Sequence, residues 1–176
     1  RAEAQVVTKA RLDDADAVPE RLHRALSEFG GTGALTLLSH GAASGEVWRQ
    51  LVAAAERSGA DAGQSVYDAG EVRAAAALPK VRRLQAPGNL FDRAAISARA
   101  GASIPLDLRS VYLQGVLLEP AAAADRRAPG SGHLAAAVAA AAAGEGVSPA
   151  ALLVAAMLRE LADGDRLVIG VDRPEE

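Results

Sequence analysis

The chain has 176 residues, half of them apolar, and its 19 basic and 22 acidic residues give a net charge of −3. A chain of this length and hydrophobicity can bury a sizeable core, which excludes disordered and collagen-like proteins. The absence of cysteine excludes disulfides, thiolate nucleophiles and cysteine-ligated metals. No apolar run has the length of a membrane span, no basic stripe contains aromatic residues, and no targeting peptide is visible. We therefore expect a cytoplasmic protein that binds neither a membrane nor nucleic acid.

Short apolar runs alternate with segments of helical spacing along most of the chain. The apolar runs predict strands over residues 5–9, 34–40, 62–67, 81–85, 104–111 and 166–170. Helical spacing predicts helices over residues 19–29, 46–57, 70–78 and 91–99. We then expect a loop up to Gly130 and two alanine-rich helices, the second with Ser148 as N-cap and its end at Gly164. Strand starts lie roughly 20 to 30 residues apart, which is typical of βα units in a parallel sheet.

An open doubly wound sheet and a closed barrel both satisfy this α/β pattern. A dinucleotide-binding open sheet carries a glycine-rich phosphate loop after its first strand, whereas residues 9–13 read Lys-Ala-Arg-Leu-Asp. The Gly-Thr-Gly of residues 31–33 precedes its strand and is typical of a helix-to-strand turn. The pattern therefore favours the barrel, where polar residues at the carboxyl ends of the strands carry the chemistry.

Every predicted strand except the last ends in polar residues, namely Lys9, His40, Ser65, Gln85, Arg109 and Ser110. The imidazole of His40 can exchange a proton with a substrate oxygen, and the charge of Lys9 can lower the pKa of a neighbouring group. Ser65 and Gln85 can both form hydrogen bonds with an amide-bearing ligand. A capped structural histidine, a solvated lysine and ordinary loop residues are the alternative interpretations of the same side chains.

Other candidate residues are better explained by structure than by function. The acidic cluster of Asp13, Asp14 and Asp16 lacks the spacing of a calcium loop and fits a solvated turn. His23 and His133 have no partner at metal-ligand spacing, so no metal site is expected. Trp48 occupies a packing position on its helix.

The strand-end motifs, taken in order, resemble the aldo-keto reductases. Five of them are similar to the third to seventh barrel strands of that family: Val-Thr-Lys ending at Lys9, Leu-Leu-Ser-His ending at His40, Gly-Gln-Ser-Val-Tyr at 63–67, Leu-Gln-Ala-Pro-Gly-Asn-Leu-Phe-Asp-Arg at 84–93, and Arg-Ser-Val-Tyr-Leu-Gln-Gly at 109–115. Val-Ile-Gly-Val at 168–171 resembles the eighth. The resemblance implies an aldo-keto reductase-type (β/α)8 TIM barrel that lacks its first two strands, as one partial domain over residues 1–176.

The resemblance also implies a reaction, namely hydride transfer between NADP(H), or alternatively NAD(H), and a small carbonyl or sugar-like substrate. Lys9 and His40 match catalytic positions, and Ser65 and Gln85 match positions that bind the nicotinamide carboxamide. The cofactor-binding set continues with Arg109, Ser110, Gln114 and Gly115, of which the last three match a loop that runs along the pyrophosphate.

The chain departs from the family pattern in its proton donor and around the nicotinamide. The family's catalytic aspartate and tyrosine belong to its second strand, which precedes the part of the barrel matched here. Arg109 stands where an aromatic ring often stacks on the nicotinamide, and Val66 replaces a common asparagine. A catalytically degenerate barrel that serves as a binding or regulatory module is therefore the alternative function. A subunit that completes its barrel with another chain is a third possibility, and a homodimer stays open.

Overall fold

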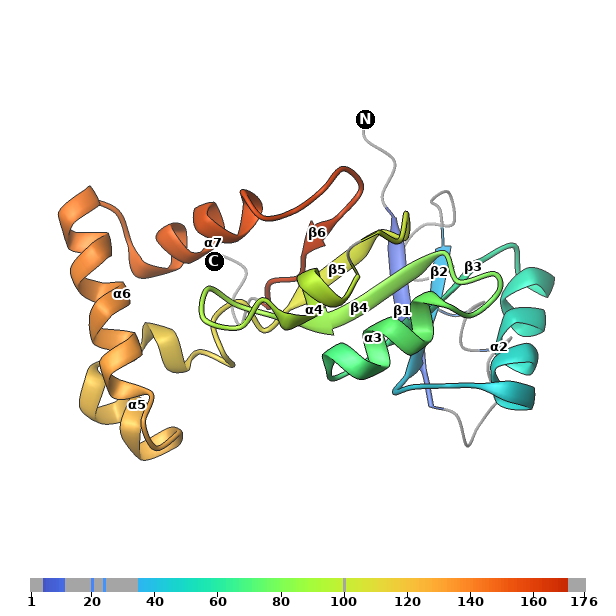
Figure 1. The fold of residues 1–176 in the computed structure, drawn as a ribbon, viewed down its shortest axis with the longest axis horizontal. Helices are drawn as coiled ribbons and strands as arrows, with labels where there is room; N and C mark the ends of the chain where they lie inside the picture. The colour runs from blue at the N-terminus through green and yellow to red at the C-terminus, as the bar shows by residue number, and fades with distance from the viewer. Residues whose placement is uncertain (1–4, 12–19, 21–23, 25–34, 100, 171–176) are drawn as a thin grey trace.

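Six parallel strands form one sheet in the part of the chain that the structure describes. The structure is a computed structural model that describes residues 5–11, 20, 24, 35–99 and 101–170. The strands are β1 (Val6–Ala10), β2 (Leu35–His40), β3 (Asp61–Ser65), β4 (Arg83–Pro87), β5 (Leu106–Arg109) and β6 (Arg166–Leu167). They pair in chain order, each with the next, and every pair is parallel (Figure 1). The expectation of an α/β protein with six parallel strands is therefore confirmed.

Helices connect these strands, and their positions agree with the sequence pattern except after β5. They are α2 (Gly45–Arg57), α3 (Ala69–Ala76), α4 (Ala94–Ala98), α5 (Ala121–Arg127), α6 (Gly132–Glu145) and α7 (Pro149–Leu158), with a 3-10 turn at Val116–Leu118. The loop expected up to Gly130 contains α5, because its four consecutive alanines favour a helix. Helix α7 begins after the expected N-cap Ser148, but it ends at Leu158, before Gly164. The helix expected over residues 19–29 lies outside the described residues.

The sheet is an open half-barrel, so the prediction of an aldo-keto reductase-type (β/α)8 TIM barrel is wrong. Strands β1 and β6 lie at opposite ends of the strand order and are not paired with each other. A closed barrel of that type needs eight strands whose tilt and stagger bring the last strand against the first. The described sheet has six strands, and β6 contributes only two residues to it. The spacing of apolar runs predicts how many strands the chain forms, but it does not indicate whether the sheet closes into a barrel.

The strand order puts the helices on one face of the sheet. Because crossovers between parallel strands are right-handed, steps that all go in the same direction place the described helices that cover the sheet on the same side. Paired residues of parallel strands point to the same face, so the register assigns each residue to a face. The helix-covered face contributes apolar side chains to the main core, where they meet Trp48 and other residues of α2, α3, α4, α6 and α7; they are Ala10, Leu35, Leu37, Ala62, Leu84, Ala86, Leu106 and Leu108.

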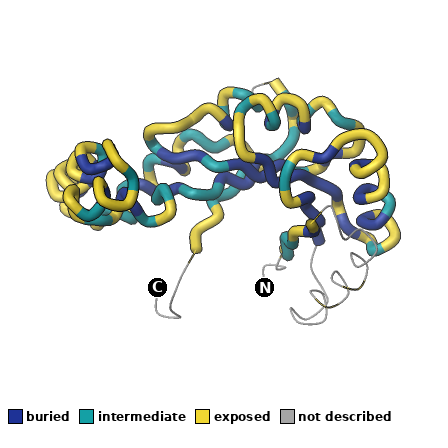
Figure 2. The backbone as a smooth tube through the Cα atoms, turned by 90° about the horizontal axis from the view of Figure 1, so that it is seen from below, coloured by how far each residue is buried: buried dark blue, intermediate teal, exposed yellow. Residues whose placement is uncertain are grey.

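The opposite, concave face is mostly polar. Its residues, read from the same register, are Val7, Lys9, Thr36, Leu38, His40, Asp61, Gly63, Ser65, Arg83, Gln85, Pro87, Asp107, Arg109 and Arg166. Figure 2 shows the buried segments running through the middle of the molecule, whereas the end formed by α5 and α6 is largely exposed. Glycine is required at position 63, because a Cβ there would collide with the backbone oxygen of Arg83 and the side chain of Leu38. No single helix of the described residues is long and apolar enough to cross a membrane; α6 and α7 reach that length and composition only as a pair bent by 91°.

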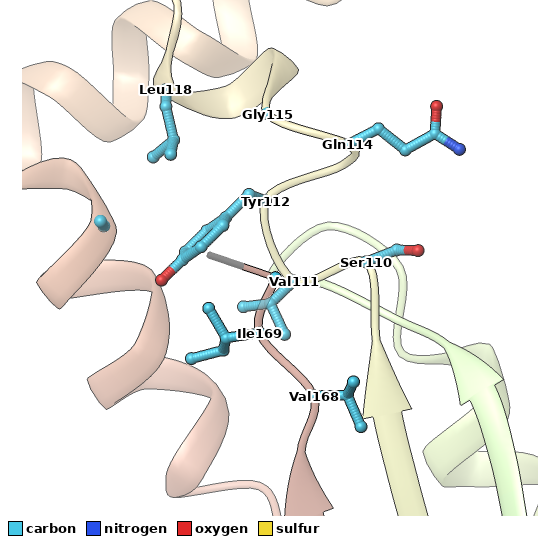
Figure 3. A pocket seen from close by; sticks show the side chains of 10 residues that line it. Ser110, Val111, Tyr112, Gln114, Gly115, Leu118, Val168 and Ile169 are labelled. Atoms are coloured by element: carbon cyan, nitrogen blue, oxygen red, sulfur yellow. The ribbon is translucent and has the colours of Figure 1, made fainter. Parts of the chain in front are cut away.

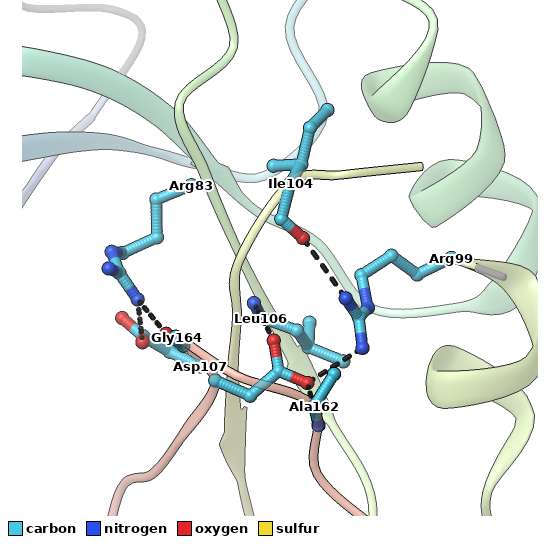
Figure 4. Close-up of polar contacts among 8 residues, drawn as sticks. Arg83, Arg99, Ile104, Leu106, Asp107, Ala162 and Gly164 are labelled. Carbon is cyan, nitrogen blue, oxygen red and sulfur yellow. Dashed lines mark hydrogen bonds and ion pairs between the residues drawn. The ribbon is translucent and has the colours of Figure 1, made fainter. Parts of the chain in front are cut away.

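One buried ion pair holds the turn before the last strand against the sheet, and a second joins β4 to β5 (Figure 4). Asp165, whose side chain is fully buried, accepts hydrogen bonds from Arg99 Nη2 at 2.6 Å and from the backbone N–H groups of Leu106 at 2.8 Å and Ala162 at 3.0 Å. Asp107 pairs with Arg83 at 2.7 Å. Each carboxylate therefore satisfies donors that burial would otherwise leave unpaired.

The Asp165→Ala substitution should destabilise the protein by about 3–5 kcal/mol, because it leaves the buried Arg99 guanidinium without its counter-charge. Urea unfolding followed by circular dichroism measures this change. Asp163→Ala, at an exposed position of the same turn, is the matched control and should change the free energy of unfolding by less than about 0.5 kcal/mol. Equal effects of the two substitutions would contradict the anchoring role of Asp165.

Candidate functional site

The concave face gathers the polar residues that end the strands. His40 is paired in register with Ser65, and Ser65 with Gln85, so the three side chains form a row across β2, β3 and β4. Lys9 on β1 and Arg109 on β5 lie on the same face. We call this group, together with Tyr67, the concave mouth. The structure thus brings together five of the residues that the sequence singled out.

Tyr67 belongs to the site although its sequence context did not suggest it. Its ring centroid lies 6.4 Å from that of His40, and the guanidinium carbon of Arg109 lies 4.9 Å from the centre of its ring. The backbone N–H of Tyr67 donates to Glu71 at 2.7 Å, while the Asp68 side chain accepts from the N–H of Glu71 at 2.9 Å. This reciprocal capping of α3 fixes the turn that carries Tyr67. The Asp-x-x-Glu spacing directly after a strand was the available signal.

His40 follows β2 at a point where the backbone is held on both sides. The hydroxyl of Ser39 donates to the carbonyl oxygen of Gly41 at 2.6 Å, and the N–H of Gly41 donates to the carbonyl oxygen of Ser65 at 2.9 Å. Gly41 has a φ of 106°, a conformation that favours glycine. The buried Gln64 carboxamide exchanges two hydrogen bonds with the backbone of Ala43. These contacts set the position of His40, whose side chain is exposed.

Ser65 and Gln85 form the floor of the mouth. The hydroxyl of Ser65 lies 3.3 Å from Gln85 Oε1, to which it donates. Only 2% of Ser65 and 5% of Gln85 is exposed. Arg109 is paired in register with Pro87, two residues beyond Gln85, so Arg109 and Tyr67 occupy the next row toward the carboxyl ends of the strands.

Arg109 is a cation without a carboxylate partner among the described residues. Its guanidinium donates to Val66 O at 3.3 Å and to Ser110 Oγ at 3.4 Å, and its buried Nε has no described acceptor. Burial lowers the pKa of the Lys9 amine, and the positive charge of Arg109 lowers that pKa further. Arg83, on the same face, is neutralised by Asp107. Lys9 and Arg109 therefore give the mouth a positive potential that favours anionic ligands.

A pocket of about 660 Å³ adjoins the concave mouth at Ser110 (Figure 3). It is lined by the segment after β5, by Ala150 of α7 and by residues 168–170. Tyr112 points its ring between Leu118 and Ile169, whereas Gln114 points away from these apolar side chains. The volume lies within the usual range for small-molecule sites, about 300–1,000 Å³. Of the expected cofactor-binding residues, Ser110, Gln114 and Gly115 line this pocket, and Ser65, Gln85 and Arg109 lie in the mouth.

The backbone along this pocket adopts an uncommon conformation. Ser110, Leu113 and Gln114 have positive φ angles of 63°, 48° and 54°, and Gly115 follows at 86°. Arg127 holds this segment by donating to the carbonyl oxygen of Gln114 at 2.9 Å, while its other Nη contacts Glu119 at 3.1 Å. Non-glycine residues in this region cost free energy and cluster at functional sites.

The residues assigned to structure mostly agree with that interpretation. Trp48 is 2% exposed, lies in the core under the helices, and donates its indole N–H to Pro79 O at 3.0 Å. His133 is exposed on α6, away from the concave mouth. Asp13, Asp14, Asp16 and His23 lie outside the described residues. Within the described part of the chain, no group of three acidic or histidine side chains could hold a metal ion.

Comparison with known proteins finds no relative: no protein-family model and no curated protein matches this chain. Together with the open sheet, this result overturns the resemblance to the aldo-keto reductases. The quoted motifs are short strand-end segments, and each of them also satisfies the general demand of a parallel sheet for a buried apolar strand followed by a polar end.

Removing the charge of Lys9 should stabilise the protein near neutral pH. Because the folded-state pKa of Lys9 lies below the ordinary value of 10.5, the unfolded chain binds more protons between the two values, and stability rises with pH across that window. The Lys9→Met variant should therefore unfold at higher urea concentration than the wild type at neutral pH. The difference should shrink above pH 10.5.

Lys80→Met is the control for this measurement. Lys80 forms an exposed ion pair with Glu56 at 2.7 Å, so its removal should give no stabilisation at neutral pH. A Lys9→Met variant that is less stable than the wild type at neutral pH, with the gap unchanged at high pH, would show that the charge of Lys9 carries no folding penalty.

Proposed function

We propose that the concave mouth and its adjoining pocket bind a nicotinamide nucleotide, NADP(H) or alternatively NAD(H), for the reduction of a small aldehyde or ketone. The observation that carries this proposal is the pair of cations, Lys9 and Arg109, that faces the mouth without a described carboxylate beside Arg109. A polyanionic ligand supplies the missing counter-charge, and guanidinium groups suit phosphate geometrically.

The donor set of the site fits such a ligand in two places. In the mouth, the Gln85 carboxamide and the Ser65 hydroxyl offer the donors and acceptors that a nicotinamide carboxamide requires. In the pocket, the backbone N–H groups of Gln114 and Gly115 and the hydroxyl of Ser110 can donate to phosphate or ribose oxygens. Arg109 stands between the two places, since it contacts both Val66 and Ser110.

The residues of the mouth also suit a carbonyl substrate. The nucleotide, when bound, supplies a hydride. His40, exposed at the end of β2, can donate a hydrogen bond to the carbonyl oxygen and pass a proton to it. The protonated fraction of Lys9 stabilises negative charge that develops on that oxygen. Tyr67 orients His40 through their ring contact.

A non-catalytic nucleotide-binding module is the second candidate function. The burial of Ser65 and Gln85 favours it, because a ligand held by deeply buried groups exchanges slowly. Slow exchange suits stable binding better than rapid turnover. The two candidates share the nucleotide and differ in whether His40 takes part in a reaction.

Arg109→Gln should weaken NADPH binding at least about tenfold, since a hydrogen bond to a charged group contributes about 1.5–3 kcal/mol and 1.4 kcal/mol corresponds to a factor of ten. Isothermal titration calorimetry measures the dissociation constant directly. Arg73→Gln, which removes an exposed arginine from α3, keeps the same net charge as Arg109→Gln and should leave the affinity unchanged. Equal affinities in the two variants would place the nucleotide elsewhere.

His40→Ala should lower the turnover of a generic aromatic aldehyde at least about tenfold, because a positioned general acid contributes a factor of about 100 to 10,000. The rate is measured by the loss of NADPH absorbance, and the affinity for NADPH should stay within about twofold of the wild type. His133→Ala, on exposed α6, is the control. Wild-type protein that binds NADPH but turns over no aldehyde would favour the binding module.

A further inference from the structure

The two lysines of this chain, Lys9 and Lys80, have different surroundings. The amine of Lys80 is neutralised by Glu56 at 2.7 Å, and the two side chains are 60% and 57% exposed. Lys9 is also exposed to solvent, but it lies on the concave face, and no ion pair is formed by its amine within the described residues. Both amines can thus be reached by a small solute, and they differ in the charges around them.

Every described element that borders the mouth adds to the environment of Lys9. Strand β2 contributes His40, the turn after β3 contributes Tyr67, and β5 contributes Arg109. Arg83 of β4 lies in the same row of the sheet as Lys9. Its charge is neutralised by Asp107, with which it forms an ion pair. Arg109 and Arg166 of β6 remain as cations on this face without a described carboxylate partner, and Asp61 remains as an unpaired carboxylate at the opposite end of β3. Of these charges, it is that of Arg109 that acts on the Lys9 amine.

We propose that Lys9 is a nucleophilic amine that captures small aldehydes or ketones bearing a carboxylate or phosphate group, forming an imine in the concave mouth. Arg109 supplies the recognition, because its guanidinium lacks a described carboxylate and its Nε lacks a described acceptor. This activity goes beyond the proposed hydride transfer, since it requires no nucleotide. It is a distinct use of the same mouth.

The lowered pKa of Lys9 supports this reactivity. Burial and the charge of Arg109 both favour the neutral amine, which is the form with a free electron pair. Lysines near a second cationic group are activated in this way in enzymes that form Schiff bases. Lys80, whose neighbour is an anion, lacks this activation.

The reaction balances without an oxidant or a reductant. The electron pair of Lys9 Nζ forms a bond to the carbonyl carbon, and the C=O π pair moves to oxygen, which takes up a proton while the nitrogen gives one up. In the resulting neutral carbinolamine, the hydroxyl group takes up one further proton and leaves as water. The nitrogen electron pair forms the C=N bond as the water leaves, so the protonated imine carries a positive charge. His40 is the group in the mouth that can transfer a proton in these steps.

Reductive trapping tests this proposal on the wild-type chain. The protein is incubated near neutral pH with 4-formylbenzoate and cyanoborohydride, which converts an imine irreversibly to a secondary amine. A protease that cleaves after glutamate then separates Lys9 from Lys80 and from the α-amine, and mass spectrometry counts the adduct at each. We expect Lys9 to be modified at least about threefold faster than Lys80, because the lowered pKa leaves a larger fraction of the Lys9 amine neutral. Equal modification of the two lysines would overturn the proposal.

The neutral amide of the same aldehyde, 4-formylbenzamide, tests the role of Arg109. Lys9 should prefer the anionic probe in the wild type, and Arg109→Gln should abolish that preference. Lys80→Arg should leave the Lys9 adduct unchanged, whereas Lys9→Arg should remove it. A Lys9 that reacts equally with both probes in the wild type overturns the anion recognition. NADPH binding that persists without selective Lys9 modification would overturn this proposal alone, while selective modification without NADPH binding would overturn only the hydride-transfer function.

Discussion

The order in which the parallel strands pair determines where the core and the polar face of this molecule lie. Each strand pairs with the next in chain order, so right-handed crossovers put the described helices that cover the sheet on one face. The register then divides the strand residues into two sets, and leucines such as Leu37 and Leu84 go under the helices. Polar residues of the alternate positions go to the concave face. One pattern of pairing thus produces both the core and a polar mouth.

The mouth carries charge that the fold compensates only in part. Asp107 neutralises Arg83 deep on the concave face, and Asp165 neutralises Arg99 at the edge where β6 joins. Arg109 instead rests on the ring of Tyr67 and acts on Lys9. Keeping two like charges on one concave surface costs stability, and a bound anion would relieve that cost. The same imbalance supports both nucleotide binding and the activation of the Lys9 amine.

Much of this arrangement could be predicted from the sequence. The positions of the strands follow from apolar runs, and the gathering of Lys9, His40, Ser65, Gln85 and Arg109 follows because the carboxyl ends of parallel strands meet at one edge. Other features depend on contacts that local sequence does not encode. Closure of a sheet depends on its total strand number and tilt, so the expected barrel was wrong. Asp165 looks like part of a polar turn, and only its partner Arg99, 66 residues away, makes it a buried anchor.

An NMR titration of the ¹⁵N-labelled protein with NADPH tests whether the concave mouth binds anions. Binding there should give saturable shifts of the backbone amides of Ser65, Val66 and residues 109–115, which weaken as salt screens the charges of Lys9 and Arg109. Amides of the outward surface of α2 and α3 should stay unchanged. Shifts confined to those helices, or no saturable shift at all, would show that the concave mouth does not bind this anion.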